Sequence, residues 1–181
     1  MKAVLFLLLG LATVTPVNAY NPLEDKDKID YVPPEEEWHE AAVDIPQTFH
    51  ADNLQTFTVK GGNDRFEYAI DRGSLQTGVD GVTRFTVVIR SKQGAVNSSY
   101  EGLRCGHREH KVYAYGSDKG LTPSAASDWQ TIPRDSSDYR TVLYEDLICN
   151  LLSGQPNPPD AVFQAMQAGR RVDSPFFNSG Y

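Results

Sequence analysis

The set of side chains in this sequence that could most readily bind a ligand lies at residues 100–104 and includes Tyr100, Glu101 and Arg104. Alternate residues of an extended strand share a face, so we expect Tyr100 and Arg104 on one face with Gly102 between them. A guanidinium fork and a phenol hydroxyl beside bare backbone would suit a carboxylate or a flat ligand. The same residues also fit a structural role, in which Gly102 marks a bulge and Arg104 pairs with an acid on the next strand.

Aromatic side chains supply a third candidate. Trp129 follows a polar loop at 117–127, and with Tyr100 and Arg104 it completes the set of candidate ligand-binding residues. The other aromatic residues of the alternating segments could join Trp129 in a binding face, but we expect most of them to fill the core, because large flat side chains are typical of small sheets. These residues are Phe57, Phe66, Tyr113 and Tyr115.

Histidine and acidic residues close to the same run raise the question of a metal site. His107 and His110 flank Glu109, but residues three apart in a strand point to opposite faces and cannot chelate one ion together. We predict no metal site and no cofactor. The sequence motifs of serine hydrolases, phosphate-binding loops and zinc peptidases do not occur, so no catalytic residue is assigned.

The first 19 residues have the pattern of an export signal. Lys2 gives a positive start, an apolar run covers 4–11, and 17–19 offers the small residues that a signal peptidase cleaves behind. The apolar run is too short to span a bilayer, so we expect no integral membrane span. No cysteine follows the expected cut, which argues against a lipoprotein. The predicted location is periplasmic or secreted.

Two cysteines, Cys105 and Cys149, remain in the exported chain. In an oxidising compartment two cysteines favour one disulfide bond. A bond between these two would close a loop of about 45 residues and contribute about 4 kcal/mol by restricting the unfolded chain. The alternative is a catalytic thiol with His107 as its base, but the sequence around Cys105 lacks the surroundings that such enzymes need.

The charge balance argues against an anionic partner. The chain carries 17 basic and 24 acidic residues, a net charge of −7, and removal of Lys2 with the signal makes it −8. A phosphate backbone or an anionic lipid surface would be repelled on average, so nucleic acid is not expected as a partner. An acidic surface mostly serves solubility.

Beyond the signal, the pattern divides the chain into three parts. Residues 20–53 form an acidic, proline-containing leader whose Trp38 we expect to pack onto the following domain. Residues 54–152 form an antiparallel β-rich domain closed by the disulfide bond. Within it, alternating residues predict strands at 54–59, 65–70, 82–90, 95–105 and 109–115, and Asp80-Gly81 predicts a hairpin turn.

Helical patterns are confined to the end of the chain. An apolar track predicts a helix over 141–152 that carries Cys149 toward the sheet, and 153–181 is expected to hold a helix at 161–168 and a tail. The fold class is therefore α+β, mainly β. We expect a small antiparallel sheet or partly open barrel with one or two short C-terminal helices.

The central block resembles the cryptic neisserial protein-like family of bacterial envelope proteins. The resemblance runs from about residue 38 to 149 and rests on the segments FEYAID (66–71), DGVTRFTVV (80–88), YEGLRC (100–105) and YAYG (113–116), with Trp129, Arg140 and Cys149. It implies a secreted or periplasmic domain, and it implies no established activity. His107, His110 and the stretch after Leu152 depart from the family pattern.

We therefore predict an exported, non-enzymatic envelope protein that binds a partner protein or a cell-wall or surface component. The alternative is an envelope hydrolase that uses Glu101, Glu109 or His107 as acid–base groups. A third hypothesis is a purely structural role in which the acidic leader contacts a basic protein surface.

Overall fold

The computed structural model of the chain describes residues 37–59, 65–125 and 127–169. The chain divides into two units, Met1–Glu37 and Trp38–Tyr181, and the described fold belongs to the second. The predicted signal at 1–19, the first part of the leader and the tail from 170 lie outside the described residues, so those predictions stay predictions.

The centre of the fold is an antiparallel sheet of eight strands in the order β1-β2-β4-β5-β6-β7, with β3 paired to β4 and β8 paired to β6. The strands are β1 (Leu54–Phe57), β2 (Phe66–Asp71), β3 (Gln76–Thr77), β4 (Val82–Ser91), β5 (Val96–Arg104), β6 (Glu109–Ser117), β7 (Gly120–Pro123) and β8 (Gln130–Thr131). A second, two-stranded sheet pairs β9 (Cys149–Asn150) with β10 (Gln155–Pro156). The main sheet is not closed, and the predicted fold class is confirmed.

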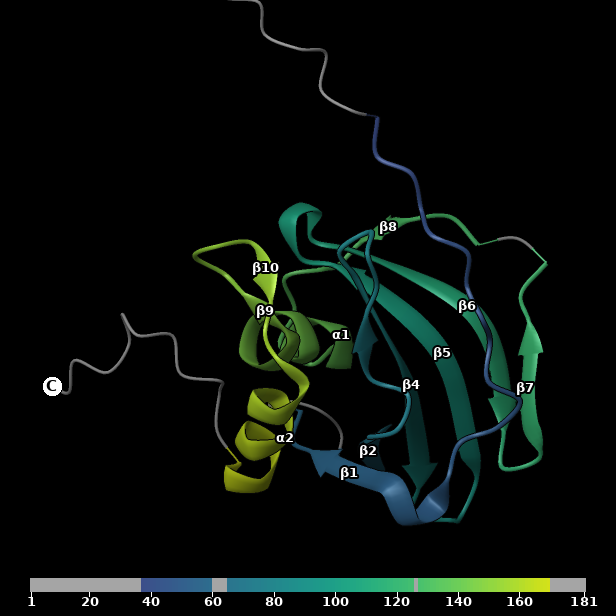
Figure 1. Ribbon diagram of the computed structural model, residues 1–181. Helices are drawn as coiled ribbons and strands as arrows, with labels where there is room; N and C mark the ends of the chain where they lie inside the picture. Colours follow the sequence, from purple (N-terminus) through teal and green to yellow (C-terminus); the bar gives the residue numbers. More distant parts are fainter. Residues whose placement is uncertain (1–36, 60–64, 126, 170–181) are drawn as a thin grey trace, which may run out of the picture. The chain divides into compact units, whose positions relative to one another are not determined.

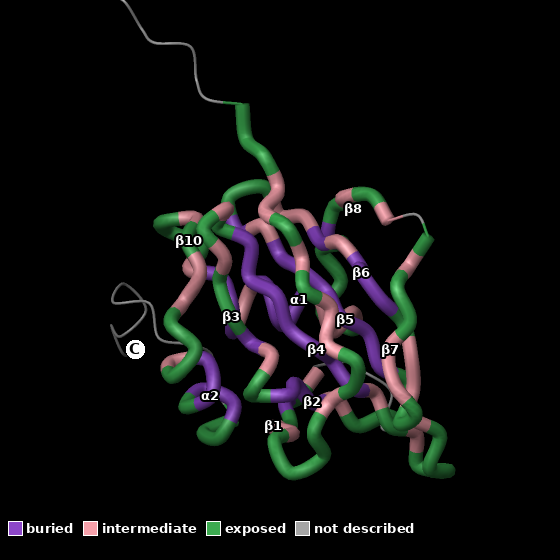
Figure 2. Tube along the Cα trace, turned by 45° about the vertical axis from the view of Figure 1, so that its right-hand side comes forward, coloured by how far each residue is buried: buried purple, intermediate pink, exposed green. Residues whose placement is uncertain are grey.

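The long central strands follow the alternation that their sequence predicted. Phe85, Val87 and Ile89 of β4 pack into the main hydrophobic core, whereas Arg84, directly before Phe85, lies on the opposite face over the ring of Tyr113. The predicted hairpin turn precedes β4, and Gly81 adopts a left-handed φ of 75° there, which glycine accepts without strain. Figure 2 shows the buried residues concentrated along β4 and β5.

Two short helices cover one face of the sheet. They are α1 (Tyr139–Val142), which continues into a π-helical segment (Leu143–Ile148), and α2 (Pro159–Ala168). Their apolar side chains join those of β2, β4 and β5 in the main core. Figure 1 shows both helices beside the sheet on this face.

The helix predicted over 141–152 is shorter than expected. Helical structure ends at Ile148, and Cys149 begins β9 instead of continuing a helix. The backbone N–H of Asn157 donates to the carbonyl of Ile148, and its side chain donates to the carbonyl of Leu147. Both carbonyls lie in the last turn, where no intrahelical donor remains, so Asn157 caps the end of the helix.

The disulfide bond between Cys105 and Cys149 is confirmed. Cys105 lies in a 3-10 turn (Cys105–His107) directly after β5, and the bond ties this end of the sheet to β9. Both cysteines are buried, and the Tyr144 hydroxyl donates to the carbonyl of Cys105 at 2.8 Å. Two of the aromatic residues assigned to the core, Phe66 and Tyr115, are instead 43% and 56% exposed, which corrects that prediction.

The opposite face of the sheet is covered by an extended segment that we call the strap, residues 38–48. In Figure 1 it runs along β6 and β7, away from the helices. Val43 and Ile45 of the strap pack against Tyr100 and Tyr113 in a second, smaller hydrophobic cluster. The strap therefore turns an otherwise open sheet face into a second buried layer.

Candidate functional site

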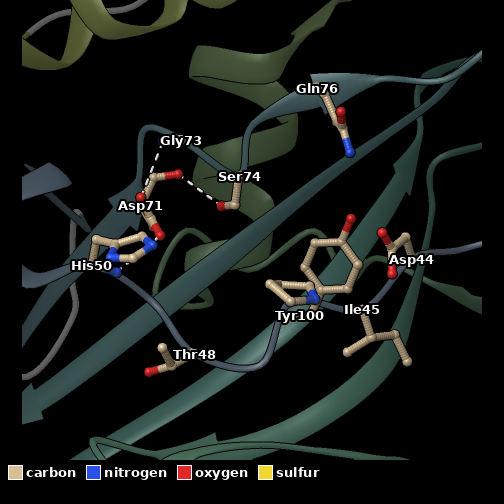
Figure 3. Close-up of a pocket in the computed structure, with 10 residues that line it drawn as sticks. Asp44, Ile45, Thr48, His50, Asp71, Gly73, Ser74, Gln76 and Tyr100 are labelled. Carbon is tan, nitrogen blue, oxygen red and sulfur yellow. Dashed lines mark hydrogen bonds between the residues drawn. The ribbon is translucent and has the colours of Figure 1, made fainter.

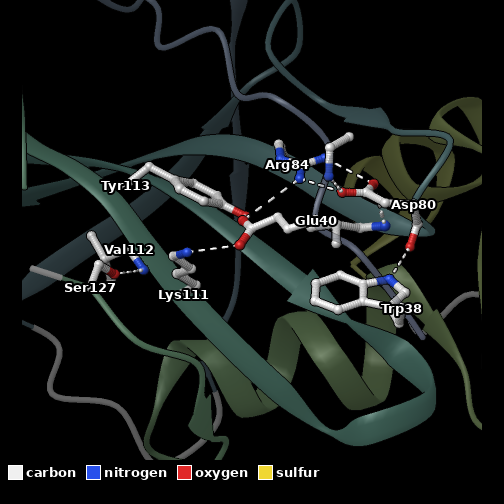
Figure 4. A network of polar contacts seen from close by, with 10 residues as sticks. Trp38, Glu40, Asp80, Arg84, Lys111, Val112, Tyr113 and Ser127 are labelled. Atoms are coloured by element: carbon white, nitrogen blue, oxygen red, sulfur yellow. Dashed lines mark hydrogen bonds and ion pairs between the residues drawn. The ribbon is translucent and has the colours of Figure 1, made fainter.

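Under the strap lies a network of charged side chains with Glu40 at its centre. Its carboxylate accepts hydrogen bonds from the Tyr113 hydroxyl at 2.7 Å and from the Lys111 amine at 2.8 Å. Arg84 approaches the same carboxylate at 3.9 Å. Figure 4 shows these groups gathered between the strap and the sheet. Burial and Glu40 raise the pKa of Tyr113 well above its usual range, so its hydroxyl stays a donor.

Asp80, in the turn before β4, pins the first residues of the strap. Its carboxylate accepts two hydrogen bonds from the Arg84 guanidinium, at 2.6 and 3.1 Å, and one from the backbone N–H of Ala41 at 2.9 Å. Its backbone carbonyl accepts from the Trp38 indole at 2.9 Å. Burial of the carboxyl disfavours its charge, but the bonds from Arg84, Ala41 and Val82 outweigh burial and lower the pKa of Asp80 to about 2.

Replacing Asp80 with Asn should therefore destabilise the protein in a pH-dependent way. Because the folded-state pKa lies near 2 and the ordinary value is 3.8, the charge stabilises the fold above about pH 4, and this stability is lost as pH falls through 2. We expect Asp80→Asn to lower the free energy of unfolding by about 2 kcal/mol at pH 7. Denaturant unfolding of both proteins at pH 7, 4 and 3 measures the difference.

The matched control for this prediction is Asp118→Asn, an exposed acid in the turn between β6 and β7. Its effect should stay within about 0.5 kcal/mol at each pH. The anchoring role of Asp80 would be refuted if the free energies of unfolding of wild type and Asp80→Asn differed little at pH 7. It would also be refuted if their difference did not decrease as the pH is lowered.

Arg104 and Trp129, two of the predicted ligand-binding residues, lie together at one end of the strap. The Arg104 guanidinium is 3.8 Å from the ring centre of Trp38 and 5.4 Å from that of Trp129. Arg104 also donates to the Glu109 carboxylate on β6 at 2.9 Å. These contacts match the structural alternative raised from the sequence, an arginine that stacks and pairs with the next strand. Their ligand-binding role stays a prediction.

Tyr100 shares this face, but the space between it and Arg104 is filled. A Cβ atom at Gly102 would come within 2.8 Å of the Tyr113 hydroxyl and 2.9 Å of a Val82 methyl. The bare backbone at Gly102 is thus occupied by the chain's own side chains. Tyr100 and Arg104 consequently border two different hollows at the two ends of the strap.

The larger hollow, which we call the strap groove, has a volume of about 450 Å³. It lies between the second half of the strap and the β2–β3 connection, with Tyr100 at its base (Figure 3). Its volume falls within the range of small-molecule binding sites, roughly 300 to 1,000 Å³. Its lining residues are Asp44, Ile45, Pro46, Thr48, His50, Asp71, Gly73, Ser74, Gln76 and Tyr100.

Two kinds of polar group line the strap groove. Asp71 is buried and already engaged, since its carboxylate accepts from the backbone N–H groups of His50 and Gly73. In contrast, Asp44 and Gln76 are exposed, and Figure 3 shows the Tyr100 hydroxyl directed toward that side of the groove. Burial raises the pKa of Tyr100 despite the opposing effects of Gln76 and Arg84, so the hydroxyl is protonated at neutral pH.

The smaller hollow has a volume of about 170 Å³ and adjoins the disulfide bond. It is lined by Trp38, Arg104 and His107, together with the turn before β4 and the β9–β10 hairpin. His107 is exposed, whereas His110 is buried on the helix-covered face, where burial first and then Arg140 lower its pKa. The two histidines therefore do not approach a common ion.

Glu101 lies on the opposite face, fully buried beneath α1. Its carboxylate accepts from the Arg140 guanidinium at 2.8 and 2.9 Å, from the Tyr139 hydroxyl at 2.6 Å and from the Ser99 hydroxyl at 2.5 Å. Burial opposes the charge of Arg140, but Glu101 outweighs burial and raises the pKa of Arg140 further above its ordinary value. The pair is part of the interior, not of a cleft.

Two wider properties bear on function. Within 37–59, 65–125 and 127–169, no three His, Cys, Asp or Glu residues lie close enough to hold a metal ion. Over the same ranges, no helix combines the length and apolarity needed to cross a membrane.

Comparison with known protein families matches residues 34–167, about three quarters of the sequence. The chain belongs to the CNP1-like family. The resemblance seen in the sequence is thereby confirmed. Neither a curated protein nor a solved structure matches this CNP1-like chain. Because the match begins before residue 38, the strap is part of the segment that the family shares.

Sequence reasoning missed the residues that hold the strap of this CNP1-like protein. The sequence pattern placed Glu40 in a solvated acidic leader, and it predicted no role for Asp80 beyond forming a turn. Glu40 meets Arg84 and Lys111, both more than 40 residues away along the chain, so no local period connects it to them. Asp80 lies only four residues before Arg84, but its bond to the backbone of Ala41 joins residues 39 apart. The one available signal was Trp38, a large aromatic residue two positions before Glu40.

Proposed function

We propose that this chain is an exported, non-enzymatic envelope protein that binds an envelope protein or a cell-wall or surface component in the strap groove. The observation that carries the proposal is a hollow of about 450 Å³ bordered by polar side chains from the strap and the β2–β3 connection. Elsewhere under the strap the charged groups neutralise one another: Glu40 pairs with Lys111 and Asp80 with Arg84.

Export rests on the sequence of the first 19 residues and is supported by the disulfide bond, since such bonds persist in oxidising compartments. Membership of the CNP1-like family agrees with this proposal. The net charge of −7 supports the absence of a nucleic-acid partner.

The hydrolase alternative receives less support from the geometry. An acid–base pair must converge on one substrate. Glu101 is fully buried and held by Arg140, Glu109 is paired with Arg104, and His107 is exposed in the turn after β5. Neither the strap groove nor the smaller hollow is bordered by more than one of these groups, since only His107 lines the smaller hollow.

The proposal predicts that filling the strap groove abolishes binding. Thr48 lines the groove and is exposed, so Thr48→Trp should block the groove without disturbing the core. Thr122→Trp, on the exposed part of edge strand β7, is the matched control. Bacterial cell walls and solubilised envelope extract would each be passed over immobilised protein. We expect capture of a component by wild type and Thr122→Trp, and at least a tenfold loss with Thr48→Trp.

Arg104→Met, tested in the same assay, distinguishes which of the two hollows is the binding site. If the strap groove is the site, this variant keeps its capture, although it loses the contacts of Arg104 with Trp38, Trp129 and Glu109. Loss of capture with Arg104→Met, together with full capture by Thr48→Trp, would move the site to the smaller hollow and overturn the proposal. Equal capture by all four proteins would overturn it as well.

A further inference from the structure

The lining of the strap groove excludes one broad class of ligand. Two carboxylates, Asp44 and Asp71, border the groove, and none of the described lining residues is lysine or arginine. An anionic ligand would enter an environment with two carboxylates and with the imidazole of His50 as the one side chain that could carry a positive charge, which is costly in a partly enclosed site. Phosphates and carboxylates are therefore disfavoured.

A cationic ligand is also disfavoured, because only one of the two carboxylates is open. Asp71 is 3% exposed, and its oxygens already accept from the backbone of His50 and Gly73 at 3.1 and 3.0 Å. The remaining carboxylate, Asp44, is exposed to water, where a single ion pair contributes little. The negative groups act mainly as hydrogen-bond acceptors.

The rest of the groove lining combines apolar patches with groups that can both donate and accept hydrogen bonds. Ile45 and Pro46 and the buried ring of Tyr100 give the groove apolar contacts. The Tyr100 hydroxyl and the Gln76 amide each donate and accept, whereas Asp44 accepts only. Figure 3 shows these three residues along one side of the groove. A ligand that fits would carry apolar C–H surface on one side and several hydroxyl groups on the other.

We propose that the strap groove binds an uncharged sugar unit of an envelope glycan. This inference rests on the proposed function and adds the chemical class of its ligand. Tyr100 and Gln76 form hydrogen bonds with ring hydroxyls, Asp44 accepts a hydrogen bond from one further hydroxyl, and Ile45 contacts the C–H face of the ring. A groove of about 450 Å³ accommodates one or two sugar rings.

The test is calorimetric titration of the purified chain with neutral, anionic and cationic probes. The neutral probes are di-N-acetylchitobiose and maltose, the anionic probe is glucuronate, and the cationic probe is spermidine. We expect binding of at least one neutral sugar and none of the charged probes. In a parallel titration followed by NMR, the backbone amide signals of Gly73 and Gln76 should shift, because both residues line the groove.

Paired variants test the residues. Tyr100→Phe removes one hydroxyl and should lower the affinity for the bound sugar about three- to tenfold, which corresponds to the loss of one hydrogen bond. Gln76→Ala should act in the same direction. The controls are Tyr115→Phe and Gln93→Ala, which change exposed residues outside the groove and should leave affinity unchanged. Unfolding midpoints equal to that of wild type establish that the variants are folded.

The outcomes separate this inference from the function on which it rests. Spermidine or glucuronate binding in place of sugar, no binding of any neutral sugar, or sugar binding untouched by Tyr100→Phe and Gln76→Ala would each overturn the sugar assignment. If Thr48→Trp still abolishes envelope capture in those cases, the groove remains the binding site for another class of component. If capture is unaffected by Thr48→Trp, the proposed function itself fails.

Discussion

Replacing Arg140 with Met is expected to lower the free energy of unfolding by about 3 to 5 kcal/mol. Glu101 is fully buried, and Arg140 donates two of the hydrogen bonds that its carboxylate accepts. Among the described residues, Arg140 is also the one basic side chain that forms an ion pair with Glu101. The variant strands a negative charge in the interior with only the hydroxyls of Tyr139 and Ser99 as donors. An uncompensated buried charge costs far more than a lost surface contact.

A double variant distinguishes a stranded charge from lost packing. Glu101→Leu combined with Arg140→Met removes both charges, and it should recover most of the stability that Arg140→Met alone loses. Equilibrium denaturant unfolding of wild type, both single variants and the double variant gives the coupling energy.

The matched control is Arg90→Met. Arg90 pairs with Glu67 at 3.5 Å, but the two side chains are 46% and 57% exposed. We expect a change within about 1 kcal/mol, because exposed ion pairs are weak. If Arg140→Met cost no more than Arg90→Met, the buried position of Glu101 would be wrong.

Removing the disulfide bond should have a comparable effect. Replacing both Cys105 and Cys149 with Ala frees a loop whose ends are 44 residues apart, which should cost about 4 kcal/mol by enlarging the conformational freedom of the unfolded chain. The bond also fixes the end of β5 to β9, so the loss should appear as a lower denaturant midpoint for the whole domain.

Reductant provides the internal control for this prediction. Wild type in excess dithiothreitol should approach the midpoint of the double alanine variant, and the variant itself should not respond. A thiol count of two on the unfolded, unreduced protein would contradict the bond. Equal midpoints for wild type and variant would show that the link adds nothing to stability.

Local patterns in the sequence predicted the sheet well. The alternation of Phe85, Val87 and Ile89 determined which face of β4 is buried, because side chains of a strand alternate strictly between its faces. Asp80-Gly81 predicted the turn before β4 because glycine accepts the left-handed backbone that a tight hairpin needs. The disulfide bond followed from having two cysteines in a chain that the sequence predicts to be exported.

Contacts between distant segments could not be predicted in the same way. Glu101 meets Arg140 across 39 residues, and Glu40 meets Tyr113 across 73, so no local period connects them. The helix that ends at Ile148 is capped by Asn157, which reaches the carbonyls of Leu147 and Ile148 from the far side of the β9–β10 hairpin. Each of these features is decided by tertiary packing.

In the candidate site, too, local patterns predicted some features, and contacts between distant segments determined the others. Alternation placed Tyr100 and Arg104 on one face, as the structure has them, but it could not reveal that Tyr113 and Val82 fill the space at Gly102. The strap groove depends on the path of residues 38–48 across the sheet, which their sequence leaves open.

The central claim is that an envelope component occupies the strap groove, and photocrosslinking from within the groove tests it most directly. A photoreactive phenylalanine would replace Thr48, which lines the groove, or Thr122, which does not, in the full chain expressed with its signal. The account predicts a light-dependent adduct with an envelope component from position 48 and none from position 122. Adducts from position 122 alone, or the same adducts from both positions, would contradict it.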